Sequence, residues 1–552
     1  MTFTSPWPHL DIPKCNILSY LFPQAVTPSD QPVWINASNP SDSLSPAQML
    51  SWIKRFAVGL DRLGVAEREV ILVLSPNQIP VSIVYLAAAG SKRCFTGVNP
   101  IYTVSEVAHQ MKAIQAAVVL VHPALLKTGM AAAKLANVPA DRIFSFSNVE
   151  DRTAASQGVR DWLSILASEG DADSWQWDPL HGDEAAQTTA VVNFSSGTTG
   201  LPKGVCITHY NLVANSAQAI INESHGKQHQ TEEKWLAFLP LYHAYSQLFT
   251  INIACKLQAK VYIMPKFVFE DFLRHIEKFK ITTIQLVPPI VVMMAKRPET
   301  ARYNLRSVKS MVSGAAPLSS DLQNEFINRF GVKLRQAFGM SETTCAGIMT
   351  PRGAKNIVGS IGCLLPNTEA RLIGEDGEEI IKDNQPGELC LRGPQIMSEY
   401  WRNKEATRDS LHDGWLKTGD VALVREGRWW IVDRKKELIK VNGLQVAPAE
   451  LEAVLLEHPD VTDAAVVGMM IHDEESPRAY VVLSERSKGK IKAADIQDFV
   501  AGKVAKHKQL SGGVQFIDEV PKLASGKIVR KVLKEWAKRD AKAIGSTVKA
   551  RL

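Results

Sequence analysis

The chain has 552 residues, which is too long for a single hydrophobic core and predicts two or more domains. Hydrophobic residues make up 45% of it and charged residues 22%, ordinary globular values that exclude a disordered or fibrous protein. The formal net charge is +6, and residues 521–552 alone contribute +8 from ten Lys or Arg and two Asp or Glu. This excess is too local for a nucleic-acid-binding surface, so we expect no nucleic-acid partner.

The apolar runs and the N-terminal residues give no signal for a membrane or for export. No run approaches the roughly 20 apolar residues that cross a bilayer, so no transmembrane segment is expected. The first fifteen residues contain prolines and an acid where a secretory signal has a basic and then an apolar run. Seven scattered cysteines without metal-ligand spacing predict free thiols in a reducing compartment.

Residues 46–63 predict an amphipathic helix, because apolar side chains recur at helical spacing, Pro46 suits the first turn and Gly64 suits the C-cap. The β-branched run VILVL that follows predicts a buried strand, and residues 81–90 predict another helix. Strand and helix signals then alternate through TTAVVNF, AKVYIMP, ITTIQLVP and VKSMVSG. Such alternation predicts α/β layers with largely parallel strands.

The pattern changes near residue 385, where short strands and glycine turns predict a small β-rich subdomain. After the charged run 433–436 a new unit begins, with a helix that has Pro448 in its first turn and the strand runs DAAVVGM and AYVVLS. We therefore predict an α/β protein with two domains. Residues 1–432 form a large domain of several subdomains, and residues 433–552 form a smaller α+β domain that begins at a charged hinge near 433–436.

The segment 195–204, SSGTTGLPKG, directly follows the predicted strand TTAVVNF. Its glycines let backbone N–H groups converge on an anion, its hydroxyls add donors, and Lys203 adds a positive charge. The segment therefore predicts a polyphosphate-binding loop. It lacks the GxxxxGK[ST] spacing of a Walker A loop, which excludes a P-loop ATPase.

Further motifs follow in order: FLPLYHAYS (238–246), SGAAPLS (313–319), QAFGMSET (336–343), GWLKTGD (414–420), DRKKELIKVNGLQVAPAELE (433–452) and PKLASGKIVRK (521–531). Together with the loop, and with the weaker NPIYTVSE (99–106), they resemble the adenylate-forming superfamily over nearly the whole chain. That superfamily comprises acyl-CoA synthetases, firefly luciferase and the adenylation domains of nonribosomal peptide synthetases. The resemblance is strongest to the 4-coumarate–CoA ligase-like branch. It implies an ATP-dependent acyl-CoA ligase that makes an acyl adenylate and pyrophosphate, then transfers the acyl group to CoA.

The resemblance also implies site residues for ATP and its Mg²⁺ ion. Glu342 would hold the metal, and Lys527, Lys440 and His243 are the candidate catalytic residues. Lys527 would bridge the carboxylate and the α-phosphate. We do not expect His243 to be a general base, because a carboxylic acid is already ionised at neutral pH. The expected nucleotide contacts are Ser195, Ser196, Gly197, Thr198, Thr199, Gly200, Lys203, Gln336, Ala337, Phe338, Ser341, Asp420, Arg434 and Lys436.

For the second step the resemblance implies that the C-terminal domain rotates about the hinge and withdraws Lys527. CoA would then meet Lys266, Asn442, Gly443 and Gln445. Asn442 stands where coumarate ligases usually have lysine. The expected acyl pocket consists of Tyr245, Phe249, Val312, Gly314, Ala315, Thr343, Thr344 and Met349. Since Phe249 and Val312 replace polar positions of related aryl ligases, an apolar aliphatic or aryl-alkanoic acid is expected.

Two alternatives share these motifs: a luciferase-like oxygenase that uses the acyl adenylate, and a stand-alone adenylating enzyme that loads a carrier protein. The PLYHAYSQLF segment has no acid to pair with an amino-acid ammonium group, which disfavours an amino-acid substrate. The last three residues, Ala550-Arg551-Leu552, resemble the Ser-Lys-Leu peroxisomal signal. They predict the peroxisomal import receptor as a partner and the peroxisome as the location, with the cytoplasm as the alternative.

Overall fold

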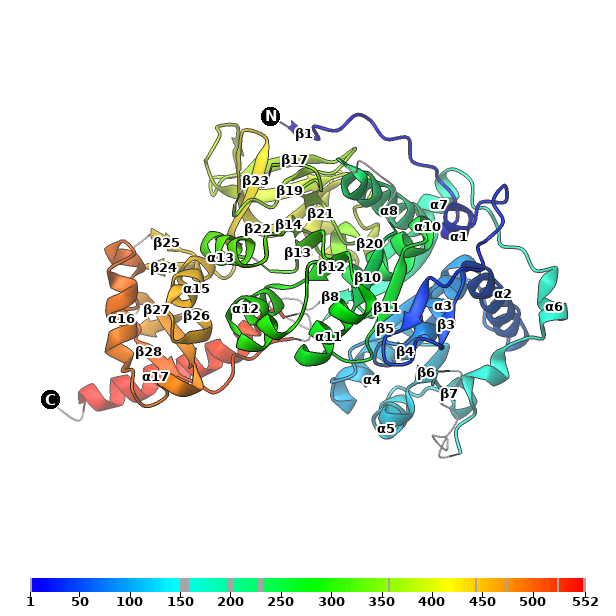
Figure 1. Ribbon diagram of the computed structural model, residues 1–552, viewed down its shortest axis with the longest axis horizontal. Helices are drawn as coiled ribbons and strands as arrows, with labels where there is room; N and C mark the ends of the chain where they lie inside the picture. The colour runs from blue at the N-terminus through cyan, green and yellow to red at the C-terminus, as the bar shows by residue number, and fades with distance from the viewer. Residues whose placement is uncertain are drawn as a thin grey trace.

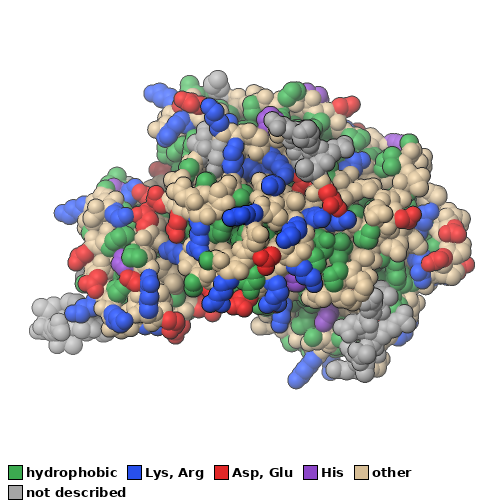
Figure 2. Space-filling view, in the orientation of Figure 1, with side chains coloured by type: hydrophobic (Ala, Val, Ile, Leu, Met, Phe, Trp, Pro, Cys, Tyr) green, Lys and Arg blue, Asp and Glu red, His purple; other side chains and the backbone are tan. Residues whose placement is uncertain are grey.

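The computed structural model describes residues 2–148, 158–195, 202–226, 232–316, 318–355, 358–441, 444–471, 474–523 and 526–549, with side chains only to residue 542 in the last helix. Figure 1 shows two layered sheets with their helices, a β-rich subdomain above them and a C-terminal domain at one end. Basic and acidic side chains are interspersed over the face in Figure 2. In the part of the chain described, no helix is long and apolar enough to cross a membrane.

The first sheet has the order β20–β9–β8–β5–β4–β6–β7 and is parallel from β8 to β7. The predicted buried strand VILVL is confirmed as β4. Helix α2 begins as predicted, with Pro46 in its first turn and a capping box between Ser45 and Gln48. The strands are β4 (Val70–Leu74), β5 (Cys94–Val98), β6 (Val118–Val121), β7 (Ile143–Ser145), β8 (Thr189–Ser195), β9 (Lys203–Thr208) and β20 (Glu399–Tyr400). The associated helices are α1 (Ile17–Leu21), α2 (Pro46–Arg62), α3 (Ile79–Gly90), α4 (Val104–Ile114), α5 (Leu126–Leu135), α6 (Glu169–Asp173), α7 (Asp183–Gln187) and α8 (His209–Ser224).

Helix α3 joins the first sheet to the second. It contacts β5 and β8 of the first sheet and β2 of the second, and all its residues are buried. This placement explains why α3 is almost entirely apolar, since a helix covered on every side needs no polar face.

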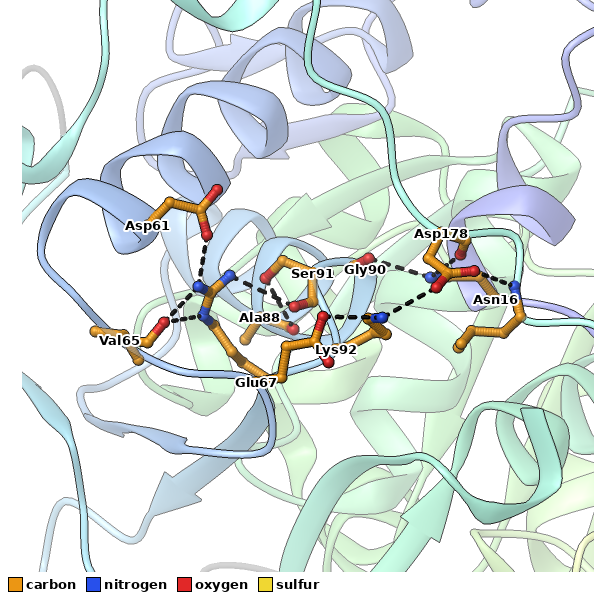
Figure 3. A network of polar contacts seen from close by, with 11 residues as sticks. Asn16, Asp61, Val65, Glu67, Ala88, Gly90, Ser91, Lys92 and Asp178 are labelled. Carbon is orange, nitrogen blue, oxygen red and sulfur yellow. Dashed lines mark hydrogen bonds and ion pairs between the residues drawn. The ribbon is translucent and has the colours of Figure 1, made fainter. Parts of the chain in front are cut away.

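The backbone carbonyls at the end of α3 are satisfied by a polar network (Figure 3). The amide of Asn16 donates to the carbonyl of Gly90 at 3.1 Å. Arg93, which follows the helix, is buried; its Nε donates to the carbonyl of Val65 at 3.0 Å and its Nη2 pairs with Asp61 at 2.6 Å. Helix ends leave orphan carbonyls, and these contacts fix the end of α3 against α1 and α2.

The second sheet has the order β16–β15–β14–β13–β12–β10–β11–β2–β3 and is parallel from β14 to β2. The predicted strands in AKVYIMP, ITTIQLVP and VKSMVSG are confirmed as β11, β12 and β13. The strands are β2 (Trp34–Asn36), β3 (Ser43–Leu44), β10 (Lys234–Ala237), β11 (Lys260–Ile263), β12 (Thr283–Leu286), β13 (Ser310–Ser313), β14 (Leu334–Phe338), β15 (Ile348–Met349) and β16 (Cys363–Leu364). The helices are α9 (Ala244–Ser246), α10 (Ala254–Leu257), α11 (Phe269–Phe279), α12 (Pro288–Lys296) and α13 (Ser320–Phe330); a π-helical segment, Gln247–Ile253, joins α9 to α10.

The predicted β-rich subdomain is confirmed as an antiparallel sheet with α14 (Lys404–Ser410) beside it. Its core order is β1–β17–β19–β22–β21, with β18 on β17 and β23 on β22. The strands are β1 (Phe3–Thr4), β17 (Glu369–Ile373), β18 (Glu379–Ile380), β19 (Gly387–Arg392), β21 (Leu411–His412), β22 (Trp415–Arg425) and β23 (Arg428–Arg434).

The described residues of the C-terminal part form a two-strand ladder, a separate three-strand sheet in the order β26–β27–β28, and three α-helices. Its strands are β24 (Ile439–Val441), β25 (Leu444–Val446), β26 (Val461–Ile471), β27 (Glu474–Leu483) and β28 (Val514–Phe516), and its helices are α15 (Pro448–Glu457), α16 (Ala493–Ala501) and α17 (Arg530–Lys549). It lies beside α12 and α13 (Figure 1), and Lys296 at the end of α12 donates to the carbonyl of Val461 at 3.0 Å.

Buried apolar residues fall into separate clusters on the two sides of residues 433–436. Three clusters use residues up to 431, and two use residues from 439 onward. The predicted α/β class, with a large N-terminal part and a smaller α+β part, is confirmed. The boundary predicted at 432/433 lies in the interval between the clusters.

Candidate active site

A cavity of about 1120 Å³ lies where the first two sheets, the β-rich subdomain and the C-terminal part meet. Its wall brings together half of the predicted site residues from distant parts of the sequence: Ser195, Lys203, His243, Tyr245, Phe249, Gly314, Ala315, Ala337, Phe338, Ser341, Glu342, Met349, Arg434, Lys436 and Lys527. Gly314 and Ala315 directly follow β13, and Ala337 and Phe338 end β14. The cavity therefore lies at the carboxyl ends of these parallel strands, where α/β sheets usually bind ligands.

The predicted polyphosphate loop connects β8 to β9, two antiparallel strands of the first sheet. Ser195 and Lys203 are partners in this ladder, so the loop begins and ends at the same point of the cavity. Ser196, Gly197, Thr198, Thr199 and Gly200 lie outside the described residues. The ammonium of Lys203 lies 5.0 Å from the centroid of the Tyr400 ring, a cation–π contact that holds it at the wall.

Glu342 occupies the short 3₁₀ turn Ser341–Thr343 after β14 and is buried at the cavity wall. The hydroxyl of Tyr400 donates to its Oε1 at 2.8 Å. Burial raises the pKa of the Tyr400 hydroxyl, with a further contribution from the Glu342 charge, so the phenol keeps its proton as the donor. Tyr400 therefore links the carboxylate of Glu342 to the ammonium of Lys203.

The donor set fits Mg²⁺ held together with phosphates better than a metal enclosed by protein ligands. Among the described residues no group of three or more His, Cys, Asp or Glu side chains could hold a metal ion. Glu342 supplies one hard carboxylate to the cavity, and Mg²⁺ is usually bound through one or two carboxylates plus substrate phosphates.

Asp420 on β22 and Arg434 on β23 are register partners in the β-rich subdomain. Arg434 Nε lies 3.5 Å from Asp420 Oδ1. Burial raises the pKa of Asp420 to about 6, against the opposing charges of Arg434 and Lys527. The carboxylate is therefore ionised at neutral pH. Arg434 lines the cavity, whereas Asp420 does not line it and follows the wall residue Gly419 in the chain.

Lys527 lies in the hairpin 521–529, of which residues 524 and 525 lie outside the described part of the chain. Gly526 meets α12 of the N-terminal part: a side chain there would lie 2.9 Å from the ring of Pro289, and the φ of Gly526 is +82°, so this position requires glycine. Burial lowers the pKa of Lys527 to about 8, with help from Arg434 and against the charges of Glu437, Asp420 and Glu342. Lys527 thus supplies a mostly protonated ammonium to the cavity at neutral pH.

His243 follows β10 and lines the cavity beside Tyr242, with 4.5 Å between the two ring centroids. Burial, together with the positive charge of Lys527, lowers its pKa to about 4. The imidazole is therefore neutral at pH 7 and available to hydrogen-bond with a substrate.

The cavity continues into an apolar end formed by Tyr245, Phe249, Ala337, Ala346 and Met349. Tyr245 packs edge-on against Phe249 at 5.4 Å, and its hydroxyl donates to the carbonyl of the buried Val312 at 3.1 Å. Phe249 projects from the π-helical segment, a feature frequent at functional sites. Because the Tyr245 hydroxyl is already bonded, shape and apolar contact dominate this end.

Several predicted binding residues do not line the cavity. Gln336 donates into the core, to Gln323 at 2.9 Å and to the Leu318 carbonyl at 3.3 Å, so it does not flank the cavity as expected. Val312 contributes only its carbonyl to Tyr245.

The hydroxyls of the predicted acyl-pocket residues Thr343 and Thr344 bond to backbone carbonyls. Thr343 Oγ1 bonds the carbonyl of Met340 at 3.0 Å and thereby closes its own turn. Thr344 Oγ1 donates to the carbonyl of Gln395 at 2.7 Å. Neither hydroxyl reaches the expected acyl pocket.

The described CoA residues, Lys266 and Gln445, and the candidate catalytic residue Lys440 are also separate from the cavity. Lys266 follows β11 and is exposed, and Lys440 lies on the exposed side of β24. Gln445 on β25 donates to Glu375 of the β-rich subdomain. Asn442 and Gly443 lie outside the described residues.

The cavity wall also contains polar residues that the motifs did not single out: Tyr400, His109, Arg402, Asn403 and Lys417. Tyr400 ends β20, Arg402 and Asn403 lie between β20 and α14, and His109 comes from α4. One local signal exists, since Arg402 has a φ of +51°, and such non-glycine residues concentrate at functional sites. It is a backbone property that the sequence does not reveal.

Comparison with known proteins gives a family for this architecture. The AMP-binding enzyme family model matches residues 22–401, and the AMP-binding enzyme C-terminal domain model matches residues 450–527. Phenylacetyl-CoA ligase epaB of Aspergillus niger is 36% identical over 97% of this chain and 98% of its own length. Acyl-CoA ligase azaF of Aspergillus niger is 36% identical over 95% and 98%, and 4-coumarate–CoA ligase of Pinus taeda is 35% identical over 94% of each chain.

Solved structures agree in fold. The anthranilate CoA ligase AuaEII in complex with anthranoyl-AMP has a TM-score of 0.84 at 21% identity, covering 98% of this chain and 99% of that one. The resemblance inferred from the ordered motifs is thus confirmed. The chain belongs to the AMP-binding, adenylate-forming enzyme family, as an AMP-forming acid–thiol ligase of the acyl-CoA ligase group, with a carboxylic acid, ATP and CoA as its substrates.

Proposed function

We propose that this ligase activates an apolar acid, either aliphatic or aryl-alkanoic, with Mg²⁺-bound ATP and transfers it to CoA. The observation that carries the proposal is the continuity of the cavity. Lys203, Arg434 and Lys527 line one end. Apolar side chains line the other end, together with Tyr245, whose hydroxyl donates to the carbonyl of Val312. An acid with its carboxylate between Lys527 and His243 places its apolar group against Phe249.

In the first step a carboxylate oxygen attacks the α-phosphorus, a P–O bond to the acid forms, and the P–O bond to pyrophosphate breaks. Negative charge grows on the phosphoryl oxygens and on the leaving pyrophosphate. Lys527 stabilises the α-phosphate and the incoming carboxylate, and Lys203 stabilises the departing pyrophosphate. Asp420 and Arg434 orient the ribose. Neutral His243 orients the carboxylate by hydrogen bonding and accepts no proton.

Glu342 is the residue that would hold Mg²⁺ beside the triphosphate. When bound, the ion neutralises phosphate charge and aligns the reacting oxygens. Tyr400 supports this role by donating to one oxygen of Glu342, which fixes the orientation of the carboxylate.

In the second step the thiolate of CoA attacks the acyl carbonyl, the thioester bond forms and AMP leaves. Lys266, Lys440 and Gln445 lie away from the cavity while Lys527 occupies it. We therefore assign Lys440 and Gln445 to a second orientation of the C-terminal domain, reached by rotation near residues 433–436, in which they would meet CoA together with Lys266 of the N-terminal part. Asn442 and Gly443 would join them along the path of the pantetheine arm.

The relatives support the same class of acid. One relative is named a phenylacetyl-CoA ligase, and phenylacetate is an aryl-alkanoic acid. A hydroxycinnamate fits the apolar end less well, because the Tyr245 hydroxyl has its single hydrogen on Val312 and could only accept from a substrate phenol. A buried phenol hydroxyl without a partner would cost about 1–3 kcal/mol.

A pyrophosphate-release screen tests the proposal. The purified protein is given fatty, phenylalkanoic, hydroxycinnamic and amino acids, each with and without CoA. We expect CoA-stimulated release with fatty or phenylalkanoic acids and a mass-identified thioester product. Preference for hydroxycinnamic or amino acids would contradict the apolar assignment. Oxygen-dependent light or transfer only to a carrier protein would instead support one of the two alternatives.

We further propose a peroxisomal location, supported by the sequence of Ala550-Arg551-Leu552 and by its position at the end of a basic segment. These residues lie outside the described part of the chain. A fluorescent reporter fused to residues 530–552 should collect in peroxisomes, and the same reporter ending at residue 549 should stay diffuse. Identical diffuse signals from both would contradict the assignment.

A further inference from the structure

The hairpin that carries Lys527 is closed by its own backbone. Leu523 N–H donates to the carbonyl of Lys527 at 2.8 Å, and Val529 N–H donates to the carbonyl of Pro521 at 2.8 Å. Its first arm is tied to β26, because both oxygens of Asp463 accept from the ammonium of Lys522, at 2.6 and 2.7 Å. The position of Lys527 therefore depends on what holds the second arm.

Arg530 ends the second arm and begins α17. Its Nε donates to Glu437 Oε2 at 2.6 Å and its Nη2 to Glu452 Oε2 at 3.0 Å. Its Nη1 contacts the other oxygen of Glu452 and the carbonyl of Val466, the latter at 3.0 Å. The three charged side chains are only 12–13% exposed. One guanidinium thus joins the hairpin to α15, to β26 and to the chain just after residues 433–436.

Glu437 also connects this cluster to the cavity. Its Oε1 lies 4.0 Å from Nη1 of Arg434, whose Nε lies 3.5 Å from Asp420. A line of alternating charges therefore runs from Asp420 through Arg434 and Glu437 to Arg530. Lys527 lies three residues before Arg530 and faces the same cavity. The cluster of Arg530, Glu437 and Glu452 therefore connects the chain near residues 433–436, which joins the two domains, to the hairpin that carries Lys527.

Such a cluster is better suited to fixing geometry than to adding stability. Buried ion pairs lose much of their attraction to desolvation, and apolar replacements of similar size are often equally stable. Their directional bonds nevertheless fix the atoms they join, and Arg forms them in a rigid planar fork.

We propose that Arg530 is a positioning residue for adenylation, which holds the Lys527 hairpin in the cavity through Glu437 and Glu452. This inference rests on the proposed role of Lys527 in the first step. Arg530 touches no substrate in this arrangement. Its loss moves the ammonium of Lys527 and leaves the nucleotide contacts of the N-terminal part in place.

The experiment compares Arg530→Gln, Arg530→Lys and Glu437→Gln with wild type, with Lys527→Ala and with the control Lys531→Gln. Lys531 is the exposed cation next to Arg530. Two half-reactions are measured with an acid taken from the screen: acid-dependent ATP–pyrophosphate exchange, and thioester formation from supplied acyl-AMP and CoA. Circular dichroism and thermal melting establish that each variant is folded.

Arg530→Gln should lower the exchange kcat by about 10²-fold, because a small misplacement of a catalytic group has effects of that size. Its KM for ATP and its rate of thioester formation should stay within about twofold of wild type. Glu437→Gln keeps the Glu452 contact and should lower the exchange kcat by about tenfold. Arg530→Lys should recover part of the loss, and Lys531→Gln should match wild type.

Equal losses in both half-reactions would overturn the proposal, because they would indicate a general structural role. So would wild-type exchange in Arg530→Gln when Lys527→Ala has lost it. If Arg530→Gln does not fold, Glu437→Gln decides between the same outcomes. Absence of exchange in wild type with every acid, or full exchange in Lys527→Ala, would instead be a failure of the proposed function.

Discussion

The two ends of the cavity are built in different ways. At the polar end two of the predicted charged residues have specific neighbours: Tyr400 bonds Glu342, and Arg434 pairs with Asp420. At the apolar end the Tyr245 hydroxyl is bonded to Val312, and the remaining wall is defined by packing. The comparison teaches that the chemistry of this site depends on residue type and electrostatics, whereas selection of the acid depends on shape.

The largest expected effect comes from removing one charged side chain of the polar end while the apolar end is left unchanged. Lys527→Ala should reduce acid-dependent ATP–pyrophosphate exchange by about 10³-fold, since one preorganised charge contributes that much to a transition state. Thioester formation from supplied acyl-AMP should be nearly unchanged, because no phosphoryl transfer occurs there. Measuring both half-reactions on the same preparation tests the assignment. Parallel losses with the fold intact would mean that Lys527 does not act in the first step alone.

The next effect separates the proposed metal ligand from its neighbour. Glu342→Gln should reduce exchange by about 10²-fold at low Mg²⁺ and recover partly as Mg²⁺ rises, because the amide oxygen is a weaker ligand. Tyr400→Phe removes only the 2.8 Å hydrogen bond and should cost about tenfold or less. Chelation with EDTA should stop exchange. If Glu342→Gln has the Mg²⁺ dependence of wild type, Glu342 is not the metal ligand.

A smaller effect concerns the buried carboxylate of Asp420. Its pKa rises from 3.8 to about 6 on folding, so between these pH values the folded protein binds more protons than the unfolded chain. Stability from this group therefore falls as pH rises through that window and is constant above it.

Asp420→Asn does not ionise, so its stability relative to wild type should increase by about 2–3 kcal/mol between pH 4 and pH 7, at about 1.4 kcal/mol per pH unit of the window. The KM for ATP should rise at the same time, since the ribose loses a charged acceptor. Urea denaturation at several pH values gives the two stability curves. Curves that remain parallel would show that Asp420 titrates alike in the folded and unfolded states.

The smallest effect sharpens the comparison at the apolar end. Behind Tyr245 and Phe249 lies a small cavity of about 10 Å³, also lined by Leu236, Phe238 and Gln285. Phe249→Leu should open the acyl pocket toward it and raise kcat/KM for longer acids over shorter ones by about tenfold, the usual effect of one methylene group.

The matched control is Phe279→Leu, on α11, whose ring stacks on Tyr262 at 4.1 Å and does not line the cavity. It should leave the order of preference unchanged. An unchanged preference in Phe249→Leu itself would place the selectivity elsewhere in the wall.

The fold was predictable where local signals and tertiary packing agree. Residues 46–62 carry a cap, a proline and an apolar stripe, and they form α2. The β-branched VILVL forms β4. The pairing of β10 with β11 and β12, or of β20 with β9, could not be derived from the sequence, because partners distant in the chain are chosen by packing.

The site was predictable where its chemistry depends on residues inside contiguous motifs, as for Lys203, Glu342, Arg434 and Lys527, which all line the cavity. Position in a motif did not determine side-chain direction. Gln336 lies beside Ala337 but points into the core, where its amide donates to Gln323 and to the carbonyl of Leu318. Tyr400 was missed because a tyrosine carries no signal until folding places it on Glu342.

A rapid-quench experiment tests the central claim most directly. Enzyme, Mg²⁺, ATP and an apolar acid are mixed without CoA, quenched and analysed by mass, and CoA is then added to a second sample. We predict acyl-AMP and pyrophosphate in equal amounts before CoA, and acyl-CoA with AMP after it. Formation of ADP, or an acyl-AMP that persists when CoA is added, would contradict the account.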